Sequence, residues 1–132
     1  MEGKLIVMIT VKESIDNIAK GEELWISLGN FLDEFYYHNK ETRQQMIAEE
    51  PTDLKNVKKE YKAMFAATVH KLANDYKLSI PSWVWKKKYY MSEQPYFDGN
   101  VKGDLRLLFM YKSPSEFKHR NLFVDENVLK RV

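Results

Sequence analysis

Apolar residues recur at helical spacing at the start of the chain. Thr10 and Glu13 form the capping-box pattern that begins a helix, and Gly21 is a typical helix stop. The apolar positions between them share one face, at Val11, Ile15, Ile18 and Ala19. The sequence therefore predicts a first helix between Thr10 and Gly21.

Three more helices are predicted in the next part of the chain. Residues 22–39 carry a wide apolar stripe around Gly29, which costs about 1 kcal/mol inside a helix relative to Ala. A close approach of another helix would account for this glycine. Residues 41–50 predict a short helix that ends before Pro51. The longest helix is expected over about residues 53–77, where apolar side chains step by three or four positions.

The pattern becomes irregular near residues 79–100. Pro81, Pro95 and Gly99 interrupt this segment, and aromatic side chains are frequent within it. Aromatic segments of this kind usually wrap around a core. We therefore expect an irregular aromatic segment here rather than a regular helix.

Helical patterns return in the C-terminal part of the chain. The pattern of residues 104–113 favours a helix, although its adjacent apolar residues also allow a strand. Ser113 is a predicted N-cap, Pro114 suits the first helical position, and Glu116 completes a second capping box. A last short helix is expected after Asp125.

These elements predict an all-α fold, a single-domain helical bundle of about five to seven helices over residues 10–132. Residues 1–9 are predicted to form an N-terminal arm or a short extended leader. Their apolar run, residues 5–9, is shorter than the roughly 18 residues of a membrane span, and it lacks the features of a signal peptide. We therefore expect a cytoplasmic protein.

Composition supports a folded domain and limits its chemistry. Of the 132 residues, 44% are apolar, which is enough for one core. The net charge of +2, from 21 basic and 19 acidic residues, gives no overall case for nucleic-acid binding. The absence of cysteine removes disulfides, thiolate nucleophiles and cysteine metal sites.

Familiar catalytic and metal motifs are missing from the sequence as well. The histidines, His38, His70 and His119, have none of the spacings of a metal site, and neither a phosphate-binding glycine loop nor a serine-hydrolase motif occurs. We therefore expect no catalytic residue, no metal and no cofactor. One enzyme alternative stays open, in which a site forms only on folding, for example from Asp33, His70, His119 and Arg120.

The segment "PSWVWKKKYYMSEQPYF" combines aromatic and basic side chains. Aromatic residues are enriched in interface cores, so we expect a protein partner. Its contacts would be Trp85, Tyr89, Tyr90, Tyr96 and Arg120. The alternative is nucleic-acid binding, in which bases stack on aromatic rings and lysines attract phosphate. That alternative would use Lys86, Lys87, Lys88, Lys118, His119 and Arg120.

The stretch "FKHRN" also has a structural interpretation. Basic side chains at the end of a short helix complement its dipole, and Asn121 is a fair C-cap. We expect Arg120 to reach back to Asp33 or to another buried carboxylate. Asp33, Arg120 and Asn121 would then form a clasp between the last helix and the core. The competing interpretation turns Arg120 outward, into an interface.

Several segments together resemble a group of bacterial helical domains of uncharacterised function. The shared patterns are W-x-x-L-G-x-F-L-D, L-x-[VI]-P-x-W, P-[WY]-F, S-P-x-x-F-[RK]-x-R-N-[IL]-F-V and a terminal L-x-R-[AV]. They fall at residues 25–33, 78–83, 95–97, 113–124 and 129–132. Domains of this group look like the C-terminal part of helix-turn-helix regulators or stand alone, some of them beside nucleotidyltransferase-like toxins. The resemblance implies an antitoxin-like or regulatory interaction domain.

Overall fold

The computed structural model describes residues 8–52 and 54–131. Its elements, in chain order, are α1 (Val11–Ala19), α2 (Leu24–Tyr37), α3 (Lys40–Ala48), α4 (Lys59–Asp75), the 3-10 turns η1 (Ser82–Trp85) and η2 (Lys87–Tyr89), β1 (Tyr96–Phe97), the 3-10 turn η3 (Asp98–Asn100), α5 (Asp104–Lys112), α6 (Ser115–Lys118) and β2 (Leu122–Phe123). The predicted all-α fold is confirmed, with six α-helices in the described residues. Of the expected N-terminal arm, residues 1–7 lie outside the described residues, while Met8 and Ile9 pack against the core.

Local signals set the bounds of α1. Oγ1 of Thr10 accepts a hydrogen bond from the backbone N–H of Glu13 at 3.1 Å, and the Glu13 carboxylate accepts one from the backbone N–H of Thr10 at 3.3 Å. Beyond the helix, Gly21 has a φ of 110°, which glycine adopts without a steric penalty. The predicted start and stop of this helix are therefore confirmed.

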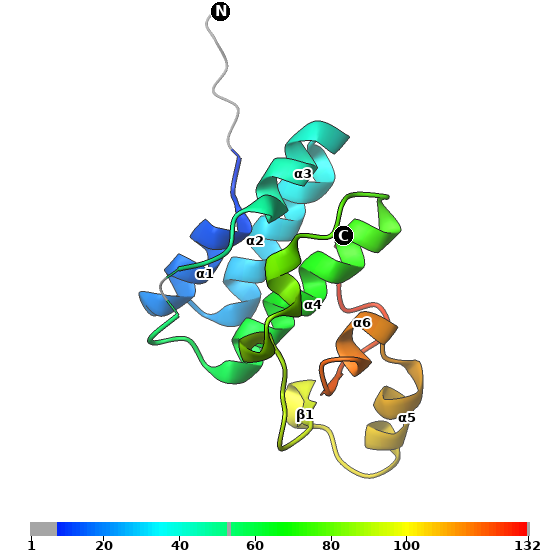
Figure 1. Ribbon diagram of the computed structural model, residues 1–132. Helices are drawn as coiled ribbons and strands as arrows, with labels where there is room; N and C mark the ends of the chain where they lie inside the picture. Colours follow the sequence, from blue (N-terminus) through cyan, green and yellow to red (C-terminus); the bar gives the residue numbers. More distant parts are fainter. Residues whose placement is uncertain (1–7, 53, 132) are drawn as a thin grey trace, which may run out of the picture.

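Helix α4 lies at the centre of the molecule (Figure 1). It contacts α1, α6, η1, η2 and β2. Ala63, Ala66 and Ala67 on this helix have no exposed surface, so neighbouring segments approach its backbone closely. Its larger apolar residues, Met64, Phe65, Val69 and Leu72, are completely buried in the same core. The N-terminal helices and the C-terminal segments are thus joined through α4.

The aromatic segment is attached to the end of α3. Its turns η1 and η2 bury Trp83 and Tyr89. The indole nitrogen of Trp83 and the hydroxyl of Tyr89 each form a hydrogen bond. Nε1 of Trp83 donates to the carbonyl of Ile47 at 3.2 Å, and the Tyr89 hydroxyl donates to the Glu50 carboxylate at 2.9 Å. These bonds hold an irregular backbone in one position against the helices.

Two expectations for the C-terminal part are wrong. Ser113 does not cap α6, because its hydroxyl accepts from the backbone N–H of Val124 at 2.8 Å and lies within hydrogen-bond distance of the carbonyls of Phe109 and Val124. The buried backbone of Val124 needs these partners. The residues after Asp125 form turns rather than a helix.

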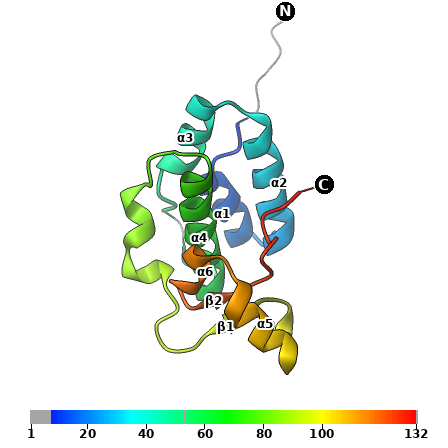
Figure 2. The ribbon, with the colours of Figure 1, turned by 90° about the vertical axis from the view of Figure 1, so that its right-hand side faces the viewer.

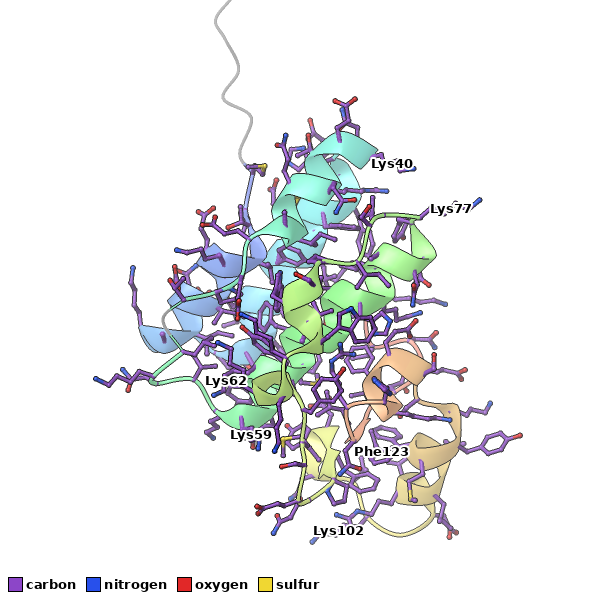
Figure 3. The ribbon with its side chains drawn as sticks, viewed as in Figure 1. Lys40, Lys59, Lys62, Lys77, Lys102 and Phe123 are labelled. Carbon is purple, nitrogen blue, oxygen red and sulfur yellow. The ribbon has the colours of Figure 1, made fainter. Side chains whose placement is uncertain are left out.

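A short parallel strand pair was not predicted. Tyr96 of β1 lies opposite Leu122 of β2, and Phe97 lies opposite Phe123. The rings of Phe97 and Phe123 stack at 4.9 Å between centroids. Phe123 lies close to α5 in the side-chain view, while Lys102 is at the edge of the molecule (Figure 3). The pair therefore connects the end of the aromatic segment with the chain that follows α6.

Gly29 of α2 makes room for a side chain rather than for a helix. A Cβ atom at this position would lie 3.0 Å from Nη2 of Arg131. The guanidinium of Arg131 pairs with Asp33, one turn further along α2, at 2.9 Å and 3.2 Å. The expected close helix–helix approach at Gly29 is therefore wrong, and the C-terminal end of the chain packs there instead.

Candidate functional site

The side chain of Arg120 is completely buried just after α6. Nη1 donates to the carbonyl of Glu116 at 3.0 Å, and Nη2 donates to the carbonyl of Val84 at 2.9 Å. Nη1 also lies 3.0 Å from Nδ1 of His70 on α4. One side chain therefore ties α6 to η1 and to α4.

Aromatic rings, rather than a carboxylate, surround the charge of Arg120. Its Cζ lies 4.9 Å from the ring centroid of Tyr90 and 5.6 Å from that of Trp85, within cation–π range. In the part of the chain that the structure describes, Arg120 forms no ion pair, and its Nε has no hydrogen-bond partner. Burial lowers the pKa of Arg120, yet a guanidinium stays charged near neutral pH. The fold thus encloses a permanent positive charge.

His70 must be neutral to hold this guanidinium. Because guanidinium nitrogens only donate, Nδ1 of His70 accepts and its Nε2 carries the proton. Burial, and then the nearby charge of Arg120, lower the pKa of His70 from its ordinary value of 6.5. The His70 ring also meets Trp85 edge to face, 4.7 Å between centroids. His70 therefore supports both Arg120 and Trp85.

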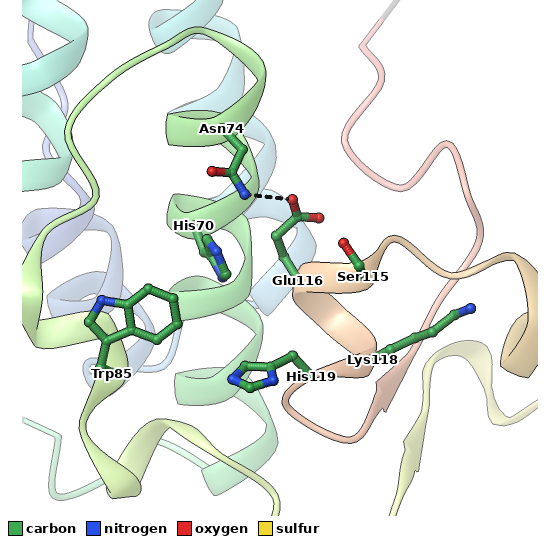
Figure 4. A pocket seen from close by; sticks show the side chains of 7 residues that line it. All are labelled: His70, Asn74, Trp85, Ser115, Glu116, Lys118 and His119. Carbon is green, nitrogen blue, oxygen red and sulfur yellow. Dashed lines mark hydrogen bonds between the residues drawn. The ribbon is translucent and has the colours of Figure 1, made fainter.

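An open cleft of about 580 Å³ lies beside this cluster (Figure 4). Its walls are formed by His70, Asn74, Trp85, Ser115, Glu116, Lys118 and His119. The indole of Trp85 is 46% exposed, and its ring centroid lies 6.2 Å from that of His119. Across the cleft, the Glu116 carboxylate accepts from Nδ2 of Asn74 at 2.9 Å. The cleft therefore presents an aromatic surface, a carboxylate and a nearby buried cation.

Although α5 is rich in apolar residues, it buries none of them. Its exposed large side chains are Leu105, Leu107, Leu108, Met110 and Tyr111, of which Leu107 is 64% and Tyr111 80% exposed. Successive residues of a helix point about 100° apart, so these side chains face several directions. The helix lies at one end of the molecule in both views (Figures 1 and 2), where Arg106 stacks on Phe97 at 4.1 Å.

The residues predicted to bind a partner divide into two groups. Tyr89 and Arg120 are completely buried, so neither contacts a partner while the protein is folded. Tyr89 is held inside by its hydrogen bond to Glu50, and Arg120 by the hydrogen bonds of its Nη1 and Nη2. Trp85, Tyr90 and Tyr96 keep some exposed surface, and Trp85 has the most exposure of the three.

The basic residues of the nucleic-acid alternative are divided in a similar way. Lys86 and Lys88 both pair with the Glu50 carboxylate, at 2.6 Å and 3.1 Å. Lys87, Lys118 and His119 are also exposed, whereas Arg120 is enclosed. Burial raises the pKa of Glu50, but the hydrogen bonds from its lysine and tyrosine neighbours together hold it below its ordinary value.

The expected contact between Arg120 and Asp33 is not formed. Asp33 pairs with Arg131, while Arg120 joins the elements through carbonyls and an imidazole. Asn121 has a left-handed φ of 63°, and its side-chain amide donates to the carbonyl of Met91 at 3.3 Å. Asn121 therefore fixes the turn after α6, and a clasp exists without the predicted carboxylate.

Folding brings together three of the four residues named for the enzyme alternative. His70 and His119 line the cleft, and Arg120 lies behind His70. Asp33 is not among them. Sequence reasoning missed the exposure of α5, although one signal was present: its apolar residues do not form a one-sided stripe. It also missed Glu116 and Asn74 as cleft residues, because their contact joins segments 42 positions apart.

Three further tests, for a metal site, for a membrane-spanning helix and for similar proteins, assign no function to the chain. Within residues 8–52 and 54–131, no group of three or more metal-ligating side chains could hold an ion. In the same residues, no helix combines the length and apolar character needed to cross a membrane. Comparisons with family models, curated proteins and solved structures find no match. The resemblance to bacterial helical domains therefore stays an expectation.

Proposed function

We propose that this protein is a non-enzymatic protein-interaction domain whose helix α5 inserts into an apolar groove of a partner. The observation that carries the proposal is the exposure of five large apolar side chains on one nine-residue helix. Helices that are apolar on most sides are normally buried, and clustered exposed apolar surface marks interaction sites. Insertion of a helix into a groove is a common mode of recognition.

The charges around α5 favour an acidic partner over a second copy of this chain. The basic side chains on or beside the helix are Lys102, Arg106, Lys112 and Lys118, against Asp104 and Glu126. Two copies packed through α5 would bring like charges together, which weakens association. A groove with Asp and Glu residues at its rim would complement this surface.

The resemblance supplies a biological setting for the proposal. It suggests an antitoxin-like or regulatory role in a bacterial toxin–antitoxin or defence context. In that setting α5 would cover an apolar groove on an acidic toxin or regulator. Trp85 lies on the separate cleft and is not needed for this contact.

Site-specific crosslinking tests whether α5 makes the contact. A photo-crosslinking amino acid replaces Tyr111 and, as a matched control, Tyr37 of α2, which is 73% exposed. We expect a stoichiometric acidic partner to be captured from position 111 and not from position 37. Equal capture from both positions, or none from position 111, would contradict the proposal.

A charge substitution gives the corresponding affinity measurement. Leu107→Glu should weaken binding of the captured partner by ~30-fold or more, the size of a hot-spot effect. Because Leu107 is 64% exposed, the thermal unfolding midpoint should not change. Unchanged affinity would refute a role for α5. Light scattering that showed a homodimer, dissociated by Leu107→Glu, would refute the acidic partner.

A further inference from the structure

We propose that the cleft between α4, η1 and α6 is a binding site for a nucleoside phosphate, either free or at the end of a strand. Apart from Lys118, which lies beside α5 as well as in the cleft, this inference does not depend on the role assigned to α5. The cleft volume of about 580 Å³ lies within the usual range of small-ligand sites, about 300–1,000 Å³. Three features of its walls fit the base and the phosphate of such a ligand.

Trp85 provides a surface for the base. Its indole is 46% exposed, yet its orientation is held by neighbouring rings. His70 meets it edge to face at 4.7 Å and His119 at 6.2 Å between centroids. Bases stack on exposed aromatic rings of this kind, and a ring already held in position loses little freedom on binding.

Lys118 provides the attraction for phosphate. Arg120 is completely enclosed next to Trp85 and His70, at the base end of the cleft, and the nearby Glu116 carboxylate offsets part of its charge. Lys118 lines the cleft and extends away from Trp85 in Figure 4, and its exposed Nζ donates to the carbonyl of Tyr111 at 2.7 Å. The base and the phosphate would therefore occupy opposite ends of the cleft.

Glu116 provides a hydrogen-bond acceptor for the edge of the base. Although burial raises its pKa, bonds from Asn74 and from the backbone hold that pKa below the ordinary value, so the side chain is a carboxylate. Carboxylates accept hydrogen bonds from amino groups of bases. Guanine offers two adjacent N–H donors to a carboxylate, whereas uracil places carbonyls on both sides of its single donor. The site should therefore prefer guanine to uracil.

Calorimetric titration of the full chain tests the proposal. The probes are guanosine monophosphate, uridine monophosphate, guanosine, inorganic phosphate and a short single-stranded guanosine oligonucleotide. We expect guanosine monophosphate or the oligonucleotide to bind more tightly than the other three probes, and the tighter of the two identifies the natural source. Binding should weaken as salt rises. No saturable binding of either guanosine phosphate, or equal binding of inorganic phosphate, would overturn the proposal.

Variants of the cleft separate a binding role from a structural one. Trp85→Leu should weaken binding of guanosine monophosphate by roughly 5- to 150-fold, the range for one stacked base, and Trp85→Phe should restore much of it. Lys118→Gln should weaken binding, whereas Lys102→Gln, with the same charge change outside the cleft, should not. Glu116→Gln should remove the preference for guanine. Unchanged affinity in a folded Trp85→Leu protein would refute the site.

Discussion

Replacing Arg120 by methionine removes the buried charge while keeping most of the side-chain volume. Exchanging a buried ion pair for apolar residues is often neutral, because both charged groups leave together. Arg120 differs from that case, since its partners are the carbonyls of Glu116 and Val84 and Nδ1 of His70, which stay in place. The substitution therefore leaves two buried carbonyl acceptors without their donor, and it also removes the donor to Nδ1 of His70.

The expected loss follows from these two acceptors. A buried polar group without a partner costs about 1–3 kcal/mol, so two of them cost about 2–6 kcal/mol. Removing a desolvated guanidinium, which has one unpartnered nitrogen, offsets part of this cost. We therefore expect Arg120→Met to lower the free energy of unfolding by about 2–4 kcal/mol, a large share of the roughly 5–15 kcal/mol of a typical domain.

Urea unfolding followed by circular dichroism measures this loss as a lower midpoint at an unchanged slope. Arg131→Met is the matched control, because it removes another guanidinium near the same end of the chain. The Arg131 side chain is 42% exposed, so its replacement should leave the midpoint almost unchanged. If Arg120→Met unfolds at the wild-type midpoint, the clasp contributes no net stability and the reasoning is refuted.

Three further measurements test other parts of the structure. Gly29→Ala should raise the free energy of unfolding by about 1 kcal/mol, through helix propensity, only in a protein that also carries Arg131→Ala and so lacks the guanidinium beside Gly29. A double-mutant cycle in urea detects this dependence as non-additivity. Because the folded pKa of His70 is depressed, the unfolded chain binds its proton first, so stability should fall as pH drops below 6.5. His70→Gln should reduce that slope between pH 5 and 7, and an unchanged slope would contradict the assignment. Because the folded pKa of Glu50 is lowered, its carboxylate stabilises the fold above the ordinary pKa of 4.5, and this stability is lost in acid. Glu50→Gln should therefore lower the free energy of unfolding at pH 7 but not at pH 3, as unfolding at the two pH values measures.

The bounds of several helices followed from residues close to them in the chain. The capping box of Thr10 and Glu13 and the stop at Gly21 were predicted correctly, because the atoms involved are at most a few positions apart. The all-α class followed in the same way from apolar residues at helical spacing. The resemblance and the function that it implies stay predictions, since no comparison tests them.

Tertiary structure alone decided which partner each polar side chain found. Ser113 had the sequence context of a cap, yet it satisfies the buried backbone of Val124. The sequence contained a plausible ion pair between Arg120 and Asp33, but Asp33 meets Arg131 and Arg120 is enclosed by carbonyls and rings. Such choices depend on distances between segments far apart in the chain, which local spacing does not determine. The exposure of α5 has the same origin. Its apolar residues favour burial, but the sequence does not determine whether another segment of the chain covers them.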